Sequence, residues 1–235
     1  MSQQREGELA ANLAHTRERI AEACARAGRR PEEVTLVVVT KYFPASDVRI
    51  LARLGVRDVG ENRHQEAVAK RSECADLALR WHFIGGLQSN KAAAVAAYAD
   101  VVESVDRTKV VAALQRGAHE RSNPLDCLLQ VSLDDPGSTT ARAGATPAEL
   151  PELADAVEAS GRLSLRGLMA VAPLGADPSV AFARLATIAA EFRERHPSAQ
   201  WLSAGMSGDL EAAIESGATH VRIGSSVLGP RPQIK

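Results

Sequence analysis

The sequence predicts a single α/β domain over residues 1–235, a (β/α)8 barrel of the TIM type with one extra helix at the N-terminus. Two observations lead to this fold class. Strand-like and helix-like segments alternate until eight strands have been passed, and the first strand, residues 34–40, is a continuous run of apolar and β-branched residues. Such a run is typical of a parallel strand that helices cover on both faces. Eight successive β-α units close most simply as a barrel, and an open doubly wound sheet is the alternative.

The first element is a helix over residues 5–27, because Leu9, Leu13 and Ile20 recur at helical spacing. We predict strands at 34–40, 56–59, 81–85, 100–105, 126–133, 163–171, 200–204 and 219–223. The intervening helices are predicted at 46–54, 62–73, 89–98, 107–121, 147–160, 178–196 and 208–216. Residues 224–235 are too few for a full eighth helix, so we expect the N-terminal helix to fill its place.

The longest stretch without a predicted element is the loop 134–147, which follows the fifth strand. Loops of this length are often lids or disordered segments. In a barrel this loop would lie over the mouth formed by the C-terminal ends of the strands.

Charge and cysteine content disfavour several classes of protein. Lysine plus arginine (28) nearly balances aspartate plus glutamate (29), so no long-range field favours nucleic acid or an anionic membrane. Cys24, Cys74 and Cys127 lack C-x-x-C spacing, and we therefore expect neither disulfides nor a metal site. Without a membrane-length apolar segment or a signal-peptide core, a cytoplasmic location is expected. We also expect a monomer, since no long exposed apolar face is evident.

Lys41 is the first candidate for a functional residue, because it closes the run of residues 34–40 at its C-terminal end. Ligands of parallel α/β folds bind at this edge of the sheet. A partly desolvated amine there can act as a nucleophile and form an imine with an aldehyde. The alternative is a lysine that ends a strand merely to stay hydrated.

Small residues that open helices after the seventh and eighth strands predict a phosphate site. Ser207-Gly208 follows the seventh strand and Gly224-Ser225 follows the eighth. A helix that begins with such residues offers free N–H groups and a favourable dipole to an anion. Barrels repeatedly build phosphate sites from these two loops. The alternative is that the glycines only permit turns.

A phosphate site that shares a cavity with an imine-forming lysine fits a phosphorylated aldehyde, and pyridoxal 5'-phosphate (PLP) is the common cellular one. Arg222 lies two residues before Gly224, which begins the second phosphate loop. Its guanidinium could meet the pyridine nitrogen and, because it keeps its proton, hold that nitrogen unprotonated. An ion pair with an acid such as Asp209 is an equal alternative.

Three further polar residues lie in or near the predicted strands. We expect His82, inside the third strand, to be a core histidine bonded to backbone rather than an acid or base. Asn62 could donate to a ligand at the mouth or cap the next helix. Glu61 could accept a proton or pair with Arg63 or Lys91, and we assign it no role.

Together these segments resemble the pyridoxal phosphate homeostasis protein family, whose fold is similar to the N-terminal barrel of bacterial alanine racemase. The resemblance spans essentially the whole chain. It is carried by Val39-Thr40-Lys41, Gly60-Glu61-Asn62, Trp81-His82-Phe83-Ile84-Gly85, Leu87-Gln88-Ser89-Asn90-Lys91, Gly167-Leu168-Met169, Gly205-Met206-Ser207 and Val221-Arg222-Ile223-Gly224.

The resemblance implies a role for each candidate residue. Lys41 would be the imine lysine and Arg222 would lie near the ring nitrogen. Asn62 and Met169 would line the site, and the phosphate would be bound by Ser207, Gly224 and Ser225.

The resemblance and the residues together favour a carrier over an enzyme. Racemases of the related fold take a second base, a tyrosine, from an additional β-domain, and this sequence offers only Tyr42 and Tyr98. We therefore expect a PLP carrier and buffer in vitamin B6 and amino-acid homeostasis, with no catalytic residue and with PLP-dependent apoenzymes as transient partners. The alternatives are a weak amino-acid racemase with Lys41 as its single base, and a cofactor-free barrel aldolase that uses Lys41 against a sugar phosphate.

Overall fold

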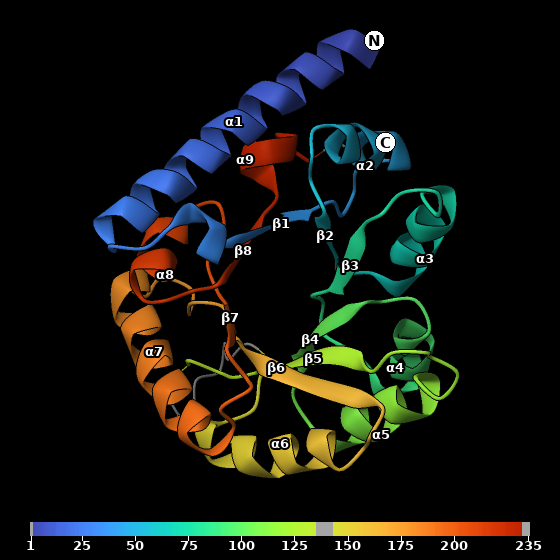
Figure 1. Ribbon diagram of the computed structural model, residues 1–235, viewed down its shortest axis with the longest axis vertical. Helices are drawn as coiled ribbons and strands as arrows, with labels where there is room; N and C mark the ends of the chain where they lie inside the picture. Colours follow the sequence, from blue (N-terminus) through green and yellow to red (C-terminus); the bar gives the residue numbers. More distant parts are fainter. Residues whose placement is uncertain (1, 135–142, 232–235) are drawn as a thin grey trace.

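The computed structural model describes residues 2–134 and 143–231 and contains a closed barrel of eight parallel strands (Figure 1). Each strand pairs with the next, and β8 returns to pair with β1, which confirms the predicted barrel and excludes the open sheet. The strands are β1 (Thr35–Val39), β2 (Asp58–Glu61), β3 (Arg80–Phe83), β4 (Val101–Val105), β5 (Leu125–Gln130), β6 (Leu163–Met169), β7 (Trp201–Ser203) and β8 (His220–Ile223).

Helices surround the barrel as an outer ring, as Figure 1 shows. They are α1 (Ser2–Arg26), α2 (Ala45–Arg53), α3 (His64–Glu73), α4 (Ser89–Ala96), α5 (Thr108–Gly117), α6 (Leu150–Glu158), α7 (Pro178–Arg195), α8 (Leu210–Glu215) and α9 (Ser225–Leu228). Two 3-10 turns, Pro31–Glu33 and Pro147–Glu149, complete the elements of the described residues. The predicted boundaries differ from these by a few residues, most at α5, which ends at Gly117 instead of continuing to residue 121.

The N-terminal helix takes the place of a full eighth barrel helix, as expected. In the described residues up to 231, the short α9 is the one helix after β8, and α1 packs along α8 and α9 (Figure 1). Asn12 and Arg5 of α1 donate to the carbonyls of Val227 and Leu228, at 3.1 and 3.0 Å. These carbonyls at the end of α9 lack N–H donors within the helix, so donors from α1 satisfy them.

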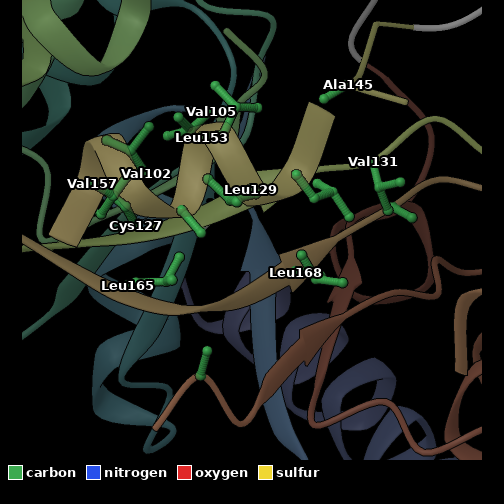
Figure 2. Close-up of a cluster of buried hydrophobic side chains, with 14 of the residues drawn as sticks. Val102, Val105, Cys127, Leu129, Val131, Ala145, Leu153, Val157, Leu165 and Leu168 are labelled. Atoms are coloured by element: carbon green, nitrogen blue, oxygen red, sulfur yellow. The ribbon is translucent and has the colours of Figure 1, made fainter. Parts of the chain in front are cut away.

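The apolar core lies between the strands and the helices. Figure 2 shows one part of it, where side chains of β4, β5, β6 and α6 meet. Leu153 and Val157 of α6 lie against Cys127 and Leu129 of β5, all fully or almost fully buried. A second apolar cluster joins β1, β2 and β8 to α1, α2 and α8. Burial on this scale fixes the strands, and therefore the residues that follow their C-terminal ends.

The inside of the barrel differs from its apolar shell, because charged and polar side chains occupy it. His82, Glu103, Ser203 and Arg222 are all less than 5% exposed although they belong to four different strands. Buried charges of this kind are stable only when each has a partner.

Residues 135–142 of the predicted loop 134–147 lie outside the described residues. No helix within residues 2–134 and 143–231 combines the length and apolar character needed to cross a bilayer. The same two ranges contain no cluster of three or more histidines, cysteines or acids able to hold a metal ion.

Candidate functional site

Lys41 follows β1 and lines a cavity at the C-terminal end of the barrel. The chain turns directly after it: the Phe43 amide donates to the Thr40 carbonyl at 3.1 Å, and Pro44 then leads into α2. Tyr42 has a φ of 70°, the only positive φ of a non-glycine residue in the described part of the chain. L-residues disfavour this region, so the turn that presents Lys41 must be held by its surroundings.

The loops after β7 and β8 form another wall of the same cavity. The hydroxyls of Ser207 and Ser225 lie 3.2 Å apart, and the Ser226 amide donates to the Ser207 hydroxyl at 3.4 Å. The Asp209 carboxylate accepts from the Met206 amide at 2.6 Å and so fixes the first loop. Two hydroxyls and the Ser226 amide of α9 thus lie together, and these are groups of the kind that bind a phosphate.

Gly205 explains why the loop after β7 can turn so closely against α8. Its φ is 91°, and a Cβ built on it would lie 2.7 Å from the Cβ of Ala213. Only glycine fits such a close approach with this backbone conformation. A Cβ on Gly208 would meet no atom within 4 Å, so the space beside this residue is open to a ligand.

One cavity of about 270 Å³ brings together six of the eight predicted site residues. These are Lys41, Ser207, Gly208, Arg222, Gly224 and Ser225. Tyr42, Ile84, Met206 and Arg231 also line it and were not predicted as site residues. Its described lining contains three cations, Lys41, Arg222 and Arg231, and no carboxylate. A small phosphorylated molecule therefore fits both its size and its charge.

The other two predicted site residues lie outside this cavity lining. Asn62 lines a neighbouring depression with Arg63 and Lys91, and its buried Oδ1 has no hydrogen-bond partner. Met169 is 1% exposed at the end of β6 and packs inside the barrel against Val101 and Leu128. Their roles as cofactor-lining residues remain predictions.

Arg222 is buried and held from several sides. Its Nη1 donates to the Ser203 hydroxyl at 2.7 Å and its Nη2 to the Ala170 carbonyl at 2.8 Å. The nearest carboxylate is Glu103, 3.9 Å away. The proposed ion pair with Asp209 is therefore wrong: Asp209 instead binds the Met206 amide.

His82 lies in the barrel core as predicted, but the prediction that its ring forms hydrogen bonds with the backbone is wrong. Its two ring nitrogens face carboxylates, Glu103 at 2.7 Å and Asp58 at 3.0 Å. We call Asp58, His82, Glu103, Ser203 and Arg222 the interior network, since each is linked to the next by a hydrogen bond or ion pair.

The interior network shifts the pKa values of its members. Burial alone would lower the pKa of His82, but hydrogen bonds with Asp58 and Glu103 raise it. Burial alone would raise the pKa of Glu103, yet the hydrogen bond and charge of His82, with Arg222 and Ser203, lower it to about 2. Glu103 is thus a buried carboxylate that stays ionised because cations and donors surround it.

A second buried network stands at the rim of the barrel beside Lys41. Lys70 of α3 donates to Glu61 at 2.7 Å, to Glu66 at 2.6 Å and to the Thr40 carbonyl at 2.6 Å. We call Thr40, Glu61, Glu66 and Lys70 the rim network. The partner of Glu61 is Lys70, so the suggested pairs with Arg63 and Lys91 are wrong.

Residues 11–232 match the family described as alanine racemase, N-terminal domain. Three bacterial relatives carry the name pyridoxal phosphate homeostasis protein. The Mycobacterium tuberculosis H37Rv protein is 43% identical, covering 97% of this chain and 94% of the relative. The Pseudomonas aeruginosa protein is 43% identical, covering 95% of this chain and 96% of the relative. The Escherichia coli K12 protein is 41% identical, covering 97% of this chain and 99% of the relative.

Solved structures share the fold. PipY of Synechococcus elongatus with PLP bound is 35% identical and superposes with a TM-score of 0.78. The match covers 94% of this chain and 100% of the PipY chain. Alanine racemase from E. faecalis superposes with a TM-score of 0.66 at 18% identity, over 96% of this chain and 59% of that chain, a likeness of fold alone. By its match over residues 11–232 and its near full-length relatives, the chain belongs to the pyridoxal phosphate homeostasis protein family, within the alanine racemase N-terminal fold.

Proposed function

We propose that this protein binds PLP, holds it as an imine on Lys41, and acts as a carrier and buffer in intracellular PLP and amino-acid homeostasis. One observation carries the proposal: Lys41 and the loops after β7 and β8 line a single cavity without a carboxylate in its described lining. The family name of the relatives and the PLP-bound PipY structure support PLP as the ligand.

Each part of the cavity suits one part of the cofactor. PLP supplies an aldehyde that reacts with a primary amine, and Lys41 supplies that amine. The hydroxyls of Ser207 and Ser225 and the amides at the start of α9 suit the phosphate. Asn62 and Met169 are proposed to complete the lining, as the family resemblance implies.

Arg222 favours a carrier over an enzyme. Its guanidinium is fixed by Ser203 and the Ala170 carbonyl, and it lines the cavity. A guanidinium beside the pyridine nitrogen does not give up its proton, so that nitrogen stays unprotonated. The ring then withdraws electrons weakly, which disfavours the carbanion chemistry of amino-acid conversion.

The proposal also includes a location, an oligomeric state and partners, which the sequence suggests. We place the protein in the cytoplasm as a monomer that passes PLP to apoenzymes by transient contact. The rival activities are slow racemisation of an amino acid with Lys41 as the single base, and aldol cleavage of a sugar phosphate without PLP. The family favours PLP, so the aldolase is the weaker rival.

An absorption spectrum tests the proposal. Purified protein incubated with PLP should show a visible imine band that Lys41→Ala abolishes, whereas Lys109→Ala, a control at an exposed lysine of α5, should keep it. The same samples should leave L- and D-amino acids unconverted. Wild-type protein that shows no band after PLP addition would rule out the carrier, and steady conversion of enantiomers that depends on Lys41 would establish the weak racemase instead.

A further inference from the structure

Lys70 is a buried cation whose bonding capacity is fully used next to the candidate site. Its side chain is 6% exposed, and its ammonium donates to three oxygens at 2.6–2.7 Å. An ammonium has three N–H donors, so no further bond to a ligand is available. Lys70 therefore cannot substitute for Lys41 as the reacting amine, and its role must lie in what it holds.

The contacts of the rim network bracket Lys41 in the chain. The residue before it, Thr40, offers its carbonyl to the Lys70 ammonium at 2.6 Å. The residue after it, Tyr42, donates its amide to Glu66 Oε1 at 2.5 Å. That same Glu66 oxygen accepts from Lys70 at 2.6 Å, so one ion pair on α3 holds both neighbours of Lys41.

This ion pair acts where the backbone most needs support. Tyr42 adopts a φ of 70°, which L-residues disfavour. Such conformations persist when surrounding contacts over-determine them, and they concentrate at functional sites. The Glu66 carboxylate binds the amide of this very residue, and the turn it stabilises fixes where the Lys41 side chain begins.

We propose that Lys70 and Glu66 are positioning residues for Lys41: their ion pair on α3 clamps the backbone on both sides of Lys41 and so sets the amine for reaction with the cofactor. The inference deepens the proposed function and depends on it.

The burial of Lys70 is better explained by this clamp than by stability alone. A buried ion pair seldom stabilises a fold more than apolar side chains of the same volume would. Two of the oxygens that accept from Lys70 belong to carboxylates, and the third is the Thr40 carbonyl, which carries no formal charge. Glu61 also accepts from the Thr40 hydroxyl at 2.6 Å, so the side chain and the carbonyl of the residue before Lys41 are both held.

The test separates positioning of the amine from binding of the phosphate. Wild type, Glu66→Ala and Lys70→Met are mixed with PLP and the imine band is followed in time; pyridoxine 5'-phosphate, which lacks the aldehyde, reports binding alone. Both variants should form the imine about tenfold more slowly, equal to about 1.4 kcal/mol, while their affinity for pyridoxine 5'-phosphate stays within about twofold of wild type.

Two rescue variants distinguish a clamp from general damage. Glu66→Gln keeps an oxygen that can accept from the Tyr42 amide, and it should recover most of the lost rate. Glycine adopts a positive φ without strain, so Glu66→Ala should slow the reaction less in a Tyr42→Gly background than in wild type. If Lys70→Met does not fold, the Glu66 variants decide alone, since the Glu66 side chain is 23% exposed and its loss leaves Lys70 paired with Glu61.

The outcomes also separate this inference from the proposed function. A wild-type protein that forms no imine ends both. The clamp is overturned, and the carrier stays in place, if Glu66→Ala forms the imine as fast as wild type. The same holds if Glu66→Ala loses affinity for pyridoxine 5'-phosphate by the same factor as it loses rate of imine formation. A slowed imine that neither Glu66→Gln nor Tyr42→Gly relieves also overturns the clamp.

Discussion

The two buried networks of this protein differ in what they hold. The interior network links strands β2, β3, β4, β7 and β8, and all of its members except Asp58 are less than 5% exposed. The rim network joins Thr40, directly after β1, and Glu61 of β2 to α3, and it includes the Glu66 carboxylate, whose side chain is 23% exposed. The first holds the side chain of Arg222, whereas the second holds the backbone around Lys41. The cavity therefore combines a cation fixed by strands with an amine that depends on a helix outside the barrel.

This difference leads to unequal consequences when a carboxylate is neutralised. Glu103→Gln removes the charge that His82 and Arg222 share, and we expect a loss of about 3 kcal/mol in unfolding free energy, as for other broken buried pairs. Glu66→Gln should change it by less than about 1 kcal/mol, because Lys70 keeps the Glu61 carboxylate as its charged partner and glutamine keeps an acceptor oxygen. Urea unfolding measures both, with Glu191→Gln on an exposed face of α7 as the control. Equal losses of unfolding free energy in Glu103→Gln and Glu66→Gln would contradict the difference between the two networks.

The interior network should also govern unfolding in acid. The folded pKa of Glu103, about 2, lies below its ordinary value of 4.5. The ionised Glu103 therefore contributes its full share to the free energy of unfolding above about pH 4.5. That share, about 3 kcal/mol, is lost as the pH falls through about 2. Stability curves of wild type and Glu103→Gln should converge over that range. Curves that stay parallel down to pH 2 would contradict the assigned charge state.

The phosphate loops form a third region, which tests how rigid the walls must be. Gly205→Ala forces a Cβ against Ala213 at 2.7 Å with φ at 91°, and we expect a loss of about 2 kcal/mol together with weaker PLP retention. Gly7→Ala is the matched control, since a Cβ there meets no atom within 4 Å and sits in α1. Thermal unfolding and PLP titration report the two effects, and a Gly205→Ala protein as stable as Gly7→Ala would refute the close approach.

The smallest expected effect comes from a change of charge at the loop after β7. Ser207→Asp places a carboxylate where a phosphate is proposed, and like-charge repulsion should weaken PLP retention by about tenfold. Ser207→Asn, similar in size and neutral, serves as the control. Equilibrium dialysis against PLP measures retention, and undiminished affinity of the aspartate variant would place the phosphate elsewhere.

Local patterns in the sequence were sufficient to predict the barrel and much of the cavity. A strand that carries an apolar run is recognisable without its neighbours, and the residue after it must lie at the barrel mouth, which located Lys41. The small residues Ser207-Gly208 and Gly224-Ser225 were recognisable for the same reason. Each prediction needed only a residue type and its place relative to one strand.

The networks behind the cavity were missed because their members meet only in the closed barrel. Glu103 lies in β4, a strand that begins and ends with valines, which signals a buried charge, yet nothing local identifies His82 and Arg222 as its partners. Lys70 follows Glu66 by four residues on α3, which predicts an ion pair. That the pair turns inward to hold the residues beside Lys41 follows only from the packing of α3.

Reduction with borohydride tests the central claim most directly. Protein incubated with PLP is treated with borohydride, which makes an imine permanent, and the peptides are mapped by mass spectrometry. We predict that Lys41 carries the added pyridoxyl phosphate and that exposed lysines such as Lys91 and Lys109 do not. A label spread over the exposed lysines, or none on Lys41, would contradict the account.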